Sequence, residues 1–428
     1  MASPSSSRNR APVIVAGGGI GGLAAALALA RKGFKSVVLE QAPQFGEIGA
    51  GIQIAPNAWH ALDALGVGAL VKKEAVFIEH LLMMDGVSGE KVIDIPCKAL
   101  PQMIDLRTNS RVTGFDIADS GVRVRLASGE VISGAALVGA DGAKSVVRDA
   151  LVGDRLPAST IHKCYRAVLN AGDVPKDLRW ASATLWAAHD SHIVHYPLRG
   201  WKLFNLVATS IGQPIGEGHA EVATPDEVLP QFAHYCEKPL KLMRTPKQFT
   251  RWMLRYREPV DNWIKGPVAL LGDAAHLMLQ YMAQGAAMAM EDAVALGLAC
   301  DAADGDFEKA FKRYQEMRLV RASRVHISAN SLVGQIFHVP DGLLRLVRND
   351  IFLGRSPERY YDALEWVFAA PDYVRQFKAS AARRPAVTQA RSAKPSRPPA
   401  ASITRRRCSA PWRPSSARTA RRSAGSRR

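Results

Sequence analysis

The sequence lacks any run of about 18 uncharged apolar residues, the shortest length for a helix that crosses a bilayer, so we expect no membrane span. Its first 11 residues are rich in Ser and lack the apolar core of a secretory signal. We therefore expect neither a membrane anchor nor a signal of this kind.

Cysteine is scarce, and we predict no metal site. An odd number of cysteines without a repeated spacing does not predict a disulfide framework. We therefore expect free thiols, which are typical of a reducing compartment, and a cytoplasmic location. The five cysteines are Cys97, Cys164, Cys236, Cys300 and Cys408.

Acidic residues are missing from the last part of the chain. Residues 378–428 hold 15 Lys or Arg and no Asp or Glu, whereas the whole chain has a net charge of +17. The remaining residues therefore carry only +2, and they give no reason to expect a specific nucleic acid partner. The tail is rich in Arg, Ser, Ala and Pro, which predicts a disordered extension. The alternative is non-specific binding of polyanions by the tail.

Near the beginning of the chain, two apolar segments flank a segment that is rich in Ala and Leu. Val13–Ala16 and Ser36–Leu39 are short apolar segments, which are typical of buried strands. Between them, Leu23–Lys32 is rich in Ala and Leu and contains no Pro or Gly, so it predicts a helix that Gly33 ends. The pattern is that of a strand, a turn, a helix and a second strand.

The turn in this unit is rich in glycine. Gly17, Gly19 and Gly22 fit the spacing G-x-G-x-x-G, in which one glycine permits the tight turn, one lets a pyrophosphate approach the backbone, and one lets helix and strand pack closely. The N–H groups of the helix N-terminus favour phosphate. Glu40 ends the second strand, where an acid can bind both ribose hydroxyls. The unit predicts dinucleotide binding; the alternative is a glycine-rich turn in an ordinary α/β unit.

Two later apolar segments predict strands that end beside an aspartate. Ala135–Gly139 leads into Asp141 and Gly142, and the segment 266–271 leads into Gly272 and Asp273. An acid at the carboxyl end of a buried strand is a usual place for ligand contact in an α/β sheet. A loop at 277–285 and an apolar helix at 286–300 are expected after the second aspartate.

The middle of the chain has a different periodicity. Alternating segments such as His192–Tyr196 and Leu203–Val207 predict an antiparallel sheet in a second, inserted domain. Because strand side chains alternate, His192 and His195 should point to opposite faces. We favour His192 as the histidine that faces a substrate, with Tyr196 on the same face. For either histidine, the alternative is a structural residue of the sheet.

The glycine turn with Glu40, the Asp141 turn and the Asp273 turn, in this order, resemble the FAD-dependent aromatic hydroxylases of the para-hydroxybenzoate hydroxylase type. The similarity extends over residues 12–361. The features that look most like 3-hydroxybenzoate 6-hydroxylases are Gln53, Tyr165-Arg166 and the stretches 195–198 and 279–285. Salicylate hydroxylases are close behind.

The resemblance implies an NAD(P)H-dependent FAD monooxygenase. It would use NADH or NADPH and O2 to hydroxylate a small phenolic acid through a flavin C4a-hydroperoxide. The favoured reaction converts 3-hydroxybenzoate to gentisate, and the alternative is the salicylate hydroxylase reaction. A homodimer is also compatible with the resemblance.

The resemblance further implies a role for individual residues. The turn glycines would hold the FAD pyrophosphate, Glu40 the adenosine ribose and Asp273 the ribityl chain or the pyrophosphate. The helix that begins near Gly285 would direct its N–H groups at the flavin edge that becomes negative on reduction. The cofactor-binding residues are Gly17, Gly19, Gly22, Glu40, Gln53, Asp141, Asp273 and Gly285.

The catalytic residues implied by the resemblance are His192, Tyr196 and Gln280. A phenol that behaves like tyrosine has a pKa of about 10, and its deprotonation makes the ring a better nucleophile, so a base near the hydroxyl should matter. Gln280 would be the polar partner of the substrate hydroxyl, unless it is a loop residue bonded to backbone. His276 is expected to be structural.

The predicted fold class is α/β. Residues 12–160 and 262–330 would form a Rossmann-like FAD-binding domain, and 161–261 an inserted antiparallel-sheet domain for the substrate. A helical C-terminal part would cover 331–377, and the terminal segments 1–11 and 378–428 would be disordered.

The sequence departs from the family pattern at two places. Only Pro96–Ile104 stands where family members have a stretch that carries a helix, and Leu277 replaces the usual proline after Gly-Asp-Ala-Ala-His. The first departure gives a further alternative, a catalytically impaired flavoprotein.

Overall fold

The computed structural model describes residues 11–44, 51–68, 71, 75–76, 80–96, 109–154, 157–213 and 220–382. The sheets and helices below belong to one unit, residues 1–383. Of the terminal segments predicted to be disordered, 1–11 and 378–428, residues 1–10 and 383–428 lie outside the described residues, as does most of the short stretch 96–104.

The first sheet has five strands in the order β15-β16-β8-β1-β2, and it confirms the buried strands that the sequence predicts. All of its pairs are parallel except β15 with β16. β1 and β8 are buried along their whole length, as expected for strands covered on both faces. The strands are β1 (Val13–Ala16), β2 (Ser36–Leu39), β8 (Ala136–Gly139), β15 (Ile264–Lys265) and β16 (Val268–Leu270).

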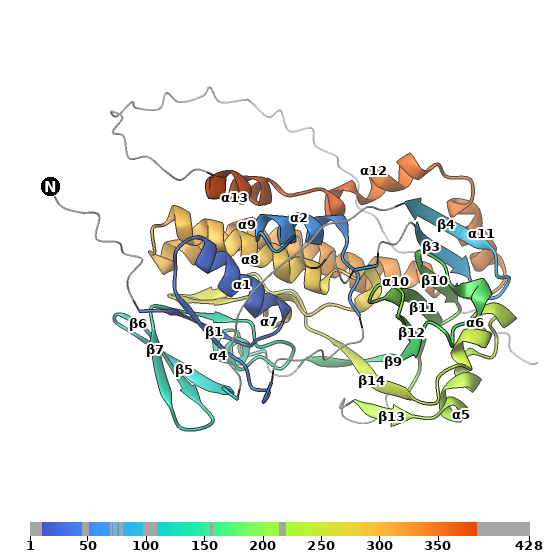
Figure 1. Cartoon of the computed structure of the whole chain (residues 1–428), viewed down its shortest axis with the longest axis horizontal. Coiled ribbons are helices and arrows are strands. Elements are labelled where there is room, and N and C mark those ends of the chain that lie inside the picture. The colour runs from blue at the N-terminus through green and yellow to red at the C-terminus, as the bar shows by residue number, and fades with distance from the viewer. Residues whose placement is uncertain are drawn as a thin grey trace, which may run out of the picture. The chain divides into compact units, whose positions relative to one another are not determined.

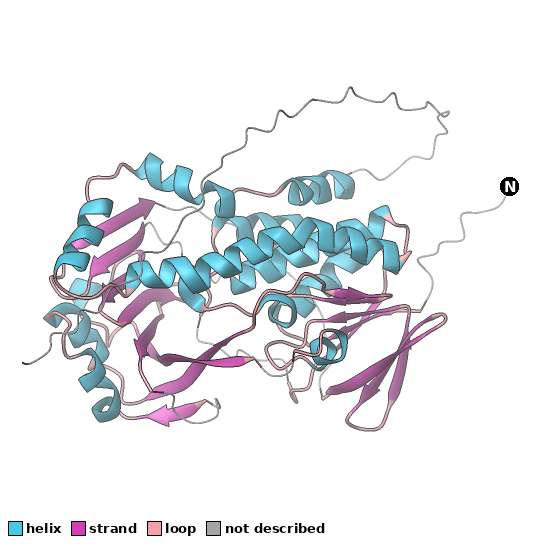
Figure 2. Cartoon of the chain, turned by 180° about the vertical axis from the view of Figure 1, so that it is seen from behind, coloured by secondary structure: helices cyan, strands magenta, loops and turns pink. Residues whose placement is uncertain are grey.

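Three long helices pack on this sheet or on one another: α1 (Ile20–Arg31), α8 (Gly285–Ala302) and α9 (Phe307–Ile327). Figures 1 and 2 show α8 and α9 side by side. α8 is apolar around most of its surface, and it is accordingly buried on all sides. A Cβ on Gly297 of α8 would lie 2.9 Å from the Cβ of Ala28 in α1, so glycine is needed for this close helix contact.

The second sheet has eight strands in the order β13-β14-β9-β12-β11-β10-β3-β4. Its strands are antiparallel except for the pair β10 and β3. The hairpin β3–β4 joins this sheet through the pair of β3 with β10, although it lies within 12–160 rather than within 161–261. The strands are β3 (His80–Asp85), β4 (Lys91–Pro96), β9 (Ala158–Asn170), β10 (Ser182–Ala188), β11 (Ser191–Leu198), β12 (Leu203–Ile211), β13 (Glu221–Ala223) and β14 (Phe249–Tyr256).

A third sheet and shorter helices complete the described fold, which confirms the α/β class. The sheet contains β5 (Val112–Ala118), β6 (Gly121–Leu126) and β7 (Val131–Gly134). The shorter helices are α2 (Pro56–Ala64), α4 (Val146–Leu151), η2 (Lys176–Leu178), α5 (Pro225–Val228), η3 (Leu229–Phe232), α6 (Glu237–Met243), α7 (Asp273–His276), η4 (Gln280–Met282), η5 (Ser328–Val333), α10 (Gly334–Phe337), α11 (Leu343–Phe352), α12 (Pro357–Phe368) and α13 (Asp372–Ala382).

Several helix boundaries differ from the sequence-based expectation for local reasons. α1 begins at Ile20 rather than Leu23, because two glycines are accommodated in its first turn. α5 and η3 do not form one continuous helix, because the nitrogen of Pro230 cannot donate an intrahelical bond. α13 ends at Ala382, beyond Phe377, where the helical part was expected to stop. The division into domains remains a prediction.

Two expectations from composition can be compared with the described residues. Cys164, Cys236 and Cys300 are free thiols, as predicted. Within the described ranges, every helix is too short or too polar to cross a bilayer.

A fully buried ionic cluster joins α8 to α9. Arg318 on α9 donates from Nε to Asp292 Oδ1 and from Nη1 to Glu291 Oε2, each at 2.6 Å, and all three side chains are excluded from solvent. Burial opposes ionisation of Asp292, but His276 and Arg318 outweigh it and hold the pKa of this carboxyl at about 2. The attraction between these charges therefore offsets the cost of removing them from water.

Replacing one member of the cluster should destabilise the fold strongly. We expect Arg318→Met to lower the free energy of unfolding by about 3–5 kcal/mol, because Asp292 and Glu291 lose a fully buried counter-ion and keep only His276 and Arg321. Urea denaturation measures the change. Arg313→Met is the matched control, since Arg313 is exposed on the same helix, and it should cost less than about 0.5 kcal/mol. Equal effects of the two substitutions would contradict this assignment.

Candidate active site

The glycine turn has the local geometry that its sequence predicts. Gly17 has φ +101°, and a Cβ there would lie 2.3 Å from the carbonyl oxygen of Ala140. A Cβ on Gly22 would lie 2.0 Å from the carbonyl oxygen of Gly17. Gly19 differs, because nothing lies within 4 Å of the position of its Cβ. Gly17 and Gly22 are therefore required by packing, whereas Gly19 leaves its side of the backbone open to a ligand.

Glu40 lies against the same turn. Its carboxylate accepts hydrogen bonds from the backbone N–H of Gly18 at 2.7 Å and of Ala42 at 2.9 Å. The acid at the end of β2 is thus held beside the glycine turn, where a ribose bound next to the pyrophosphate would lie.

Asp141 follows β8 and packs closely against the glycine turn. A Cβ on Gly17 would lie 3.0 Å from Asp141 Cα. The Asp141 carboxylate also accepts from Ser145 Oγ at 2.5 Å and from the N–H of Val146 at 2.8 Å, so it caps the start of α4. Burial raises the pKa of Asp141 although these bonds oppose the shift. The capping role was missed by the sequence analysis.

Asp273 is the first residue of α7 and lies beside the N-terminus of α8. Its Oδ1 is 3.8 Å from the position of a Cβ on Gly285, the first residue of that helix. Solvent reaches this side chain, yet desolvation by the surrounding protein raises its pKa. Both observations fit a carboxylate that is enclosed on most sides and open on one.

The three turns follow the carboxyl ends of β1, β8 and β16, which are neighbouring parallel strands of one sheet. A Cβ on Gly21 would contact both Leu271 at 2.8 Å and Ala289 of α8 at 3.3 Å. Buried Arg148 on α4 donates from Nη1 to the carbonyl oxygens of Ala274 and Ala275 in α7, at 3.1 and 2.7 Å. This side chain ties the Asp141 turn to the Asp273 turn.

This half of the site fits a dinucleotide such as FAD. Gly19 is open, Asp273 is accessible, and the N-terminus of α8 has no side-chain cap on its N–H groups. These are the features that a pyrophosphate and the polar edge of a ring system need from a protein. The predicted cofactor-binding roles themselves remain proposals.

The other half of the site is one face of the eight-stranded sheet. The structure places His192 and His195 on opposite faces, as the alternation predicts. His195 lies between Trp180 and Trp186, with ring centroids at 5.9 and 6.3 Å. His192 lies against Tyr281, whose ring centroid is 5.3 Å away.

Gln280 stands beside His192 at this face. Its Nε2 donates to Thr209 Oγ1 at 2.8 Å, and Thr209 is the residue paired with His192 across β11 and β12. The Gln280 amide is therefore bonded to a side chain of the sheet, which differs from the alternative of a loop residue bonded to backbone. Gln280 is on η4, and Gly285 begins α8 shortly after it.

Tyr196 and Gln53 connect the two halves. The Tyr196 hydroxyl donates to the carbonyl oxygen of Gly51 at 3.3 Å, and burial raises the pKa of Tyr196 to about 12, so it is a donor at neutral pH. Gln53 is half-buried on the loop that follows Gly51. This loop leads to Asn57, whose Nδ2 donates to Gln284 Oε1 at 2.9 Å, directly before α8.

Three residues of this face were missed by the sequence analysis. The Tyr281 hydroxyl is 2.5 Å from His162 Nδ1, and His192 Nδ1 is 2.8 Å from His338 Nε2. His162 could have been found, because it alternates with Cys164 on β9 and so shares the face. His338 carried no such signal, since it follows α10 in a distant part of the chain.

The backbone at Leu277 has a conformation that proline could also adopt. Leu277 has φ −54°, close to the angle that proline imposes, and its carbonyl oxygen accepts from the N–H of Arg257 at 3.1 Å. The backbone conformation thus remains that of a proline at this departure from the family pattern.

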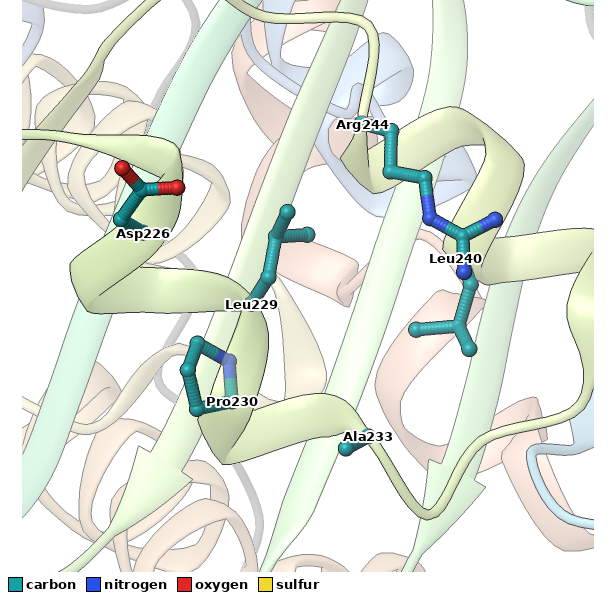
Figure 3. Close-up of a pocket in the computed structure, with 6 residues that line it drawn as sticks. All are labelled: Asp226, Leu229, Pro230, Ala233, Leu240 and Arg244. Carbon is teal, nitrogen blue, oxygen red and sulfur yellow. The ribbon is translucent and has the colours of Figure 1, made fainter.

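A separate hollow of about 360 Å³ lies between α5, η3 and α6, which are packed against the eight-stranded sheet (Figure 3). Its charged lining residues are Asp226 and Arg244, and none of the predicted site residues line it. The hollow therefore does not belong to the site described above.

Comparisons with known proteins agree with this geometry. A family model for the FAD binding domain matches residues 10–327. The 3-hydroxybenzoate 6-hydroxylase of Polaromonas naphthalenivorans (strain CJ2) is 43% identical over 384 residues, which cover 83% of this chain and 95% of that protein. That of Klebsiella oxytoca is 40% identical over 382 residues, covering 83% and 96%.

The fold is also found among solved structures. A salicylate hydroxylase substrate complex has a TM-score of 0.73 and 21% identity, and the match covers 89% of this chain and 100% of that chain. At this identity the likeness supports the fold alone. The family model and the curated relatives show that this chain belongs to the FAD-dependent aromatic hydroxylases.

Proposed function

We propose that the protein is a 3-hydroxybenzoate 6-hydroxylase, which uses FAD, NADH or NADPH, and O2 to convert 3-hydroxybenzoate to gentisate. The observation that carries the proposal is the placement of His192 and Gln280 together on the sheet face, directly before the N-terminus of α8. The relatives that share 40–43% identity with this chain carry the same activity in their names. The alternative is the salicylate hydroxylase reaction.

The residues of the glycine turn, with Glu40, Asp141 and Asp273, would hold FAD. When bound, FAD accepts electrons from NADH or NADPH, activates O2 and supplies the oxygen atom that enters the ring. The N–H groups at the start of α8 would stabilise negative charge on the ring system through the helix dipole. Gln53, on the loop after Gly51, would line the same side.

The side chains of the sheet face would prepare the substrate. Burial and the neighbouring histidines lower the pKa of His192 well below its ordinary value, so its imidazole is neutral at pH 7 but a weaker base than an exposed histidine. Its role as a base would therefore depend on its position, because a neutral imidazole has one acceptor nitrogen. The proton passes from the phenol oxygen to a ring nitrogen of His192, which leaves a phenolate and a more nucleophilic ring. Gln280 and the Tyr196 hydroxyl would hold the polar groups of the substrate by hydrogen bonds.

The apolar surroundings of His192 would keep water from the reaction. His192 is only 2% exposed, and the buried side chains of Val207, Leu279 and Tyr281 cluster on the same face. Such a dry environment strengthens the polar contacts that remain.

The location in the cell, the oligomeric state and the domain division are also proposals. Free thiols at the three described cysteines support a cytoplasmic location. A homodimer is supported by α11, where Leu343, Leu344 and Leu346 are more than half exposed. Sedimentation that gives only the 46.4 kDa mass of one chain would count against the dimer. We keep the proposed domain division, with the substrate domain at 161–261 inserted between 12–160 and 262–330.

The activity itself is tested with a substrate panel. We expect purified protein to be yellow, and 3-hydroxybenzoate to stimulate NADH or NADPH oxidation with formation of gentisate, identified by mass and retention time. Stimulation and product formation with salicylate alone would favour the alternative. A yellow protein that no phenolic acid stimulates would instead support the catalytically impaired flavoprotein.

The proposed base can be tested by substitution. We expect His192→Gln to lower the rate of gentisate formation by about 10²-fold or more, because a general base is lost, while the flavin absorbance stays unchanged. His195→Gln is the matched control on the opposite face of the same strand and should retain activity within about threefold. Full activity of His192→Gln would exclude the proposed role.

The open glycine allows a test of cofactor binding that leaves the fold intact. Gly19 has φ −72° and free space at its Cβ, so Gly19→Ala should fold normally but weaken FAD binding by about tenfold or more, because a methyl group then meets the pyrophosphate. Fluorescence titration of the apoprotein with FAD measures the affinity. Gly172→Ala, at another glycine with free space, is the control; an unchanged FAD affinity of Gly19→Ala would contradict the placement.

A further inference from the structure

A second histidine is hydrogen-bonded to the proposed base. His338 follows α10 in the C-terminal helical part, and its Nε2 is 2.8 Å from His192 Nδ1. The two ring centroids are 5.1 Å apart, and both side chains are buried, at 2% and 8% exposure. A histidine pair of this kind joins the sheet face to a helix that is remote in sequence.

Other buried histidines of the described residues are placed differently. His276 bonds to the carboxylate of Asp292 through Nε2, whereas both ring nitrogens of His195 are buried without a hydrogen-bond partner. His192 and His338 each have one nitrogen in the shared bond. The second ring nitrogens, His192 Nε2 and His338 Nδ1, take no part in that bond.

The hydrogen bond between His192 and His338 determines which ring nitrogen of His192 carries the hydrogen. A neutral imidazole has one N–H donor and one acceptor nitrogen. If His192 Nδ1–H donates to His338 Nε2, the free His192 Nε2 is the acceptor that a base needs. In the reverse tautomer, His192 Nε2 carries the hydrogen and cannot accept a proton. The partner at position 338 is thus positioned to select the state of the base.

We propose that His338 is the positioning residue of His192: its Nε2 accepts the Nδ1–H of His192 and leaves His192 Nε2 free to take the phenolic proton of the substrate. This inference rests on the proposed role of His192. His338 would not contact the substrate hydroxyl itself, and its effect would pass through the imidazole of His192.

Among the described residues, the groups around His192 and His338 do not replace His338 as the partner of His192 Nδ1. Tyr281 from η4 is paired with His162 on β9, so its hydroxyl is engaged at 2.5 Å. The charge of Asp190 raises the pKa of His162, whereas His162 and His189 lower the pKa of His338. Burial lowers the pKa of His162, and it lowers that of His338 to about 3, so the cluster is neutral at pH 7.

Two substitutions at position 338 separate positioning from packing. In the full-length FAD-loaded enzyme, His338→Gln places a carbonyl oxygen near the position of Nε2 and should keep kcat within about threefold of wild type. His338→Leu fills the site but accepts no hydrogen bond, so kcat should fall about tenfold or more while KM changes less than about threefold. His195→Leu is the control, since it removes a buried histidine from the opposite face.

A binding readout distinguishes this role from a general loss of structure. Absorbance of bound 3-hydroxybenzoate reports the pH at which its phenol ionises, and this pH should rise in His338→Leu and stay near the wild-type value in His338→Gln and His195→Leu. Equal losses in the Gln and Leu variants, or an unchanged ionisation in His338→Leu, would overturn the proposal. If wild-type and His192→Gln ionise the phenol alike, the proposed role of His192 fails first.

A measurement on the unsubstituted residue covers the case in which His338→Leu does not fold. ¹⁵N spectra of histidine-labelled protein report the tautomer of each ring, and the signals missing in His192→Gln identify His192. A proton on His192 Nδ1 and none on Nε2 supports the proposal. The reverse tautomer overturns it.

Discussion

The buried cluster around Arg318 is the constraint on which the site depends. Asp292, which it neutralises, also accepts the N–H of Gly272 at 3.0 Å and bonds to His276 Nε2 at 2.7 Å, so the turn that carries Asp273 is fixed from behind. Glu291 accepts from Asn57 Nδ2 at 2.8 Å and from the hydroxyl of Tyr373 at 2.6 Å. One cluster thus sets the start of α7, the start of α2 and the docking of α13 on α8, and the cost of burying its charges is offset by well-directed bonds.

The two halves of the candidate site are held together by different kinds of contact. Around the glycine turn, backbone atoms approach so closely that side chains are excluded at Gly17 and Gly22. On the sheet face, the contacts are between side chains, such as Gln280 with Thr209. This division suits a protein whose first half binds an invariant cofactor and whose second half selects among similar rings.

The sequence predicted those parts of the structure that local patterns determine. The first glycine unit, the strands before Asp141 and Asp273, and the opposite orientation of His192 and His195 follow from short periodicities. The place of β3 and β4 beside β10 could not be predicted, because parallel pairing of 80–85 with 182–187 leaves no local signal. His338 was missed for the same reason, since only tertiary packing brings it to His192.

The strand order of the second sheet has a consequence for the newly made chain. The inner edge of β3 is paired only with β10, so this edge stays uncovered on the ribosome until residues near 182–187 have emerged. An uncovered strand edge is a template for wrong association, and chains of this size expose such surfaces while their later parts are still being synthesised. Premature termination before residue 338 would leave the sheet paired but the histidine pair unmade.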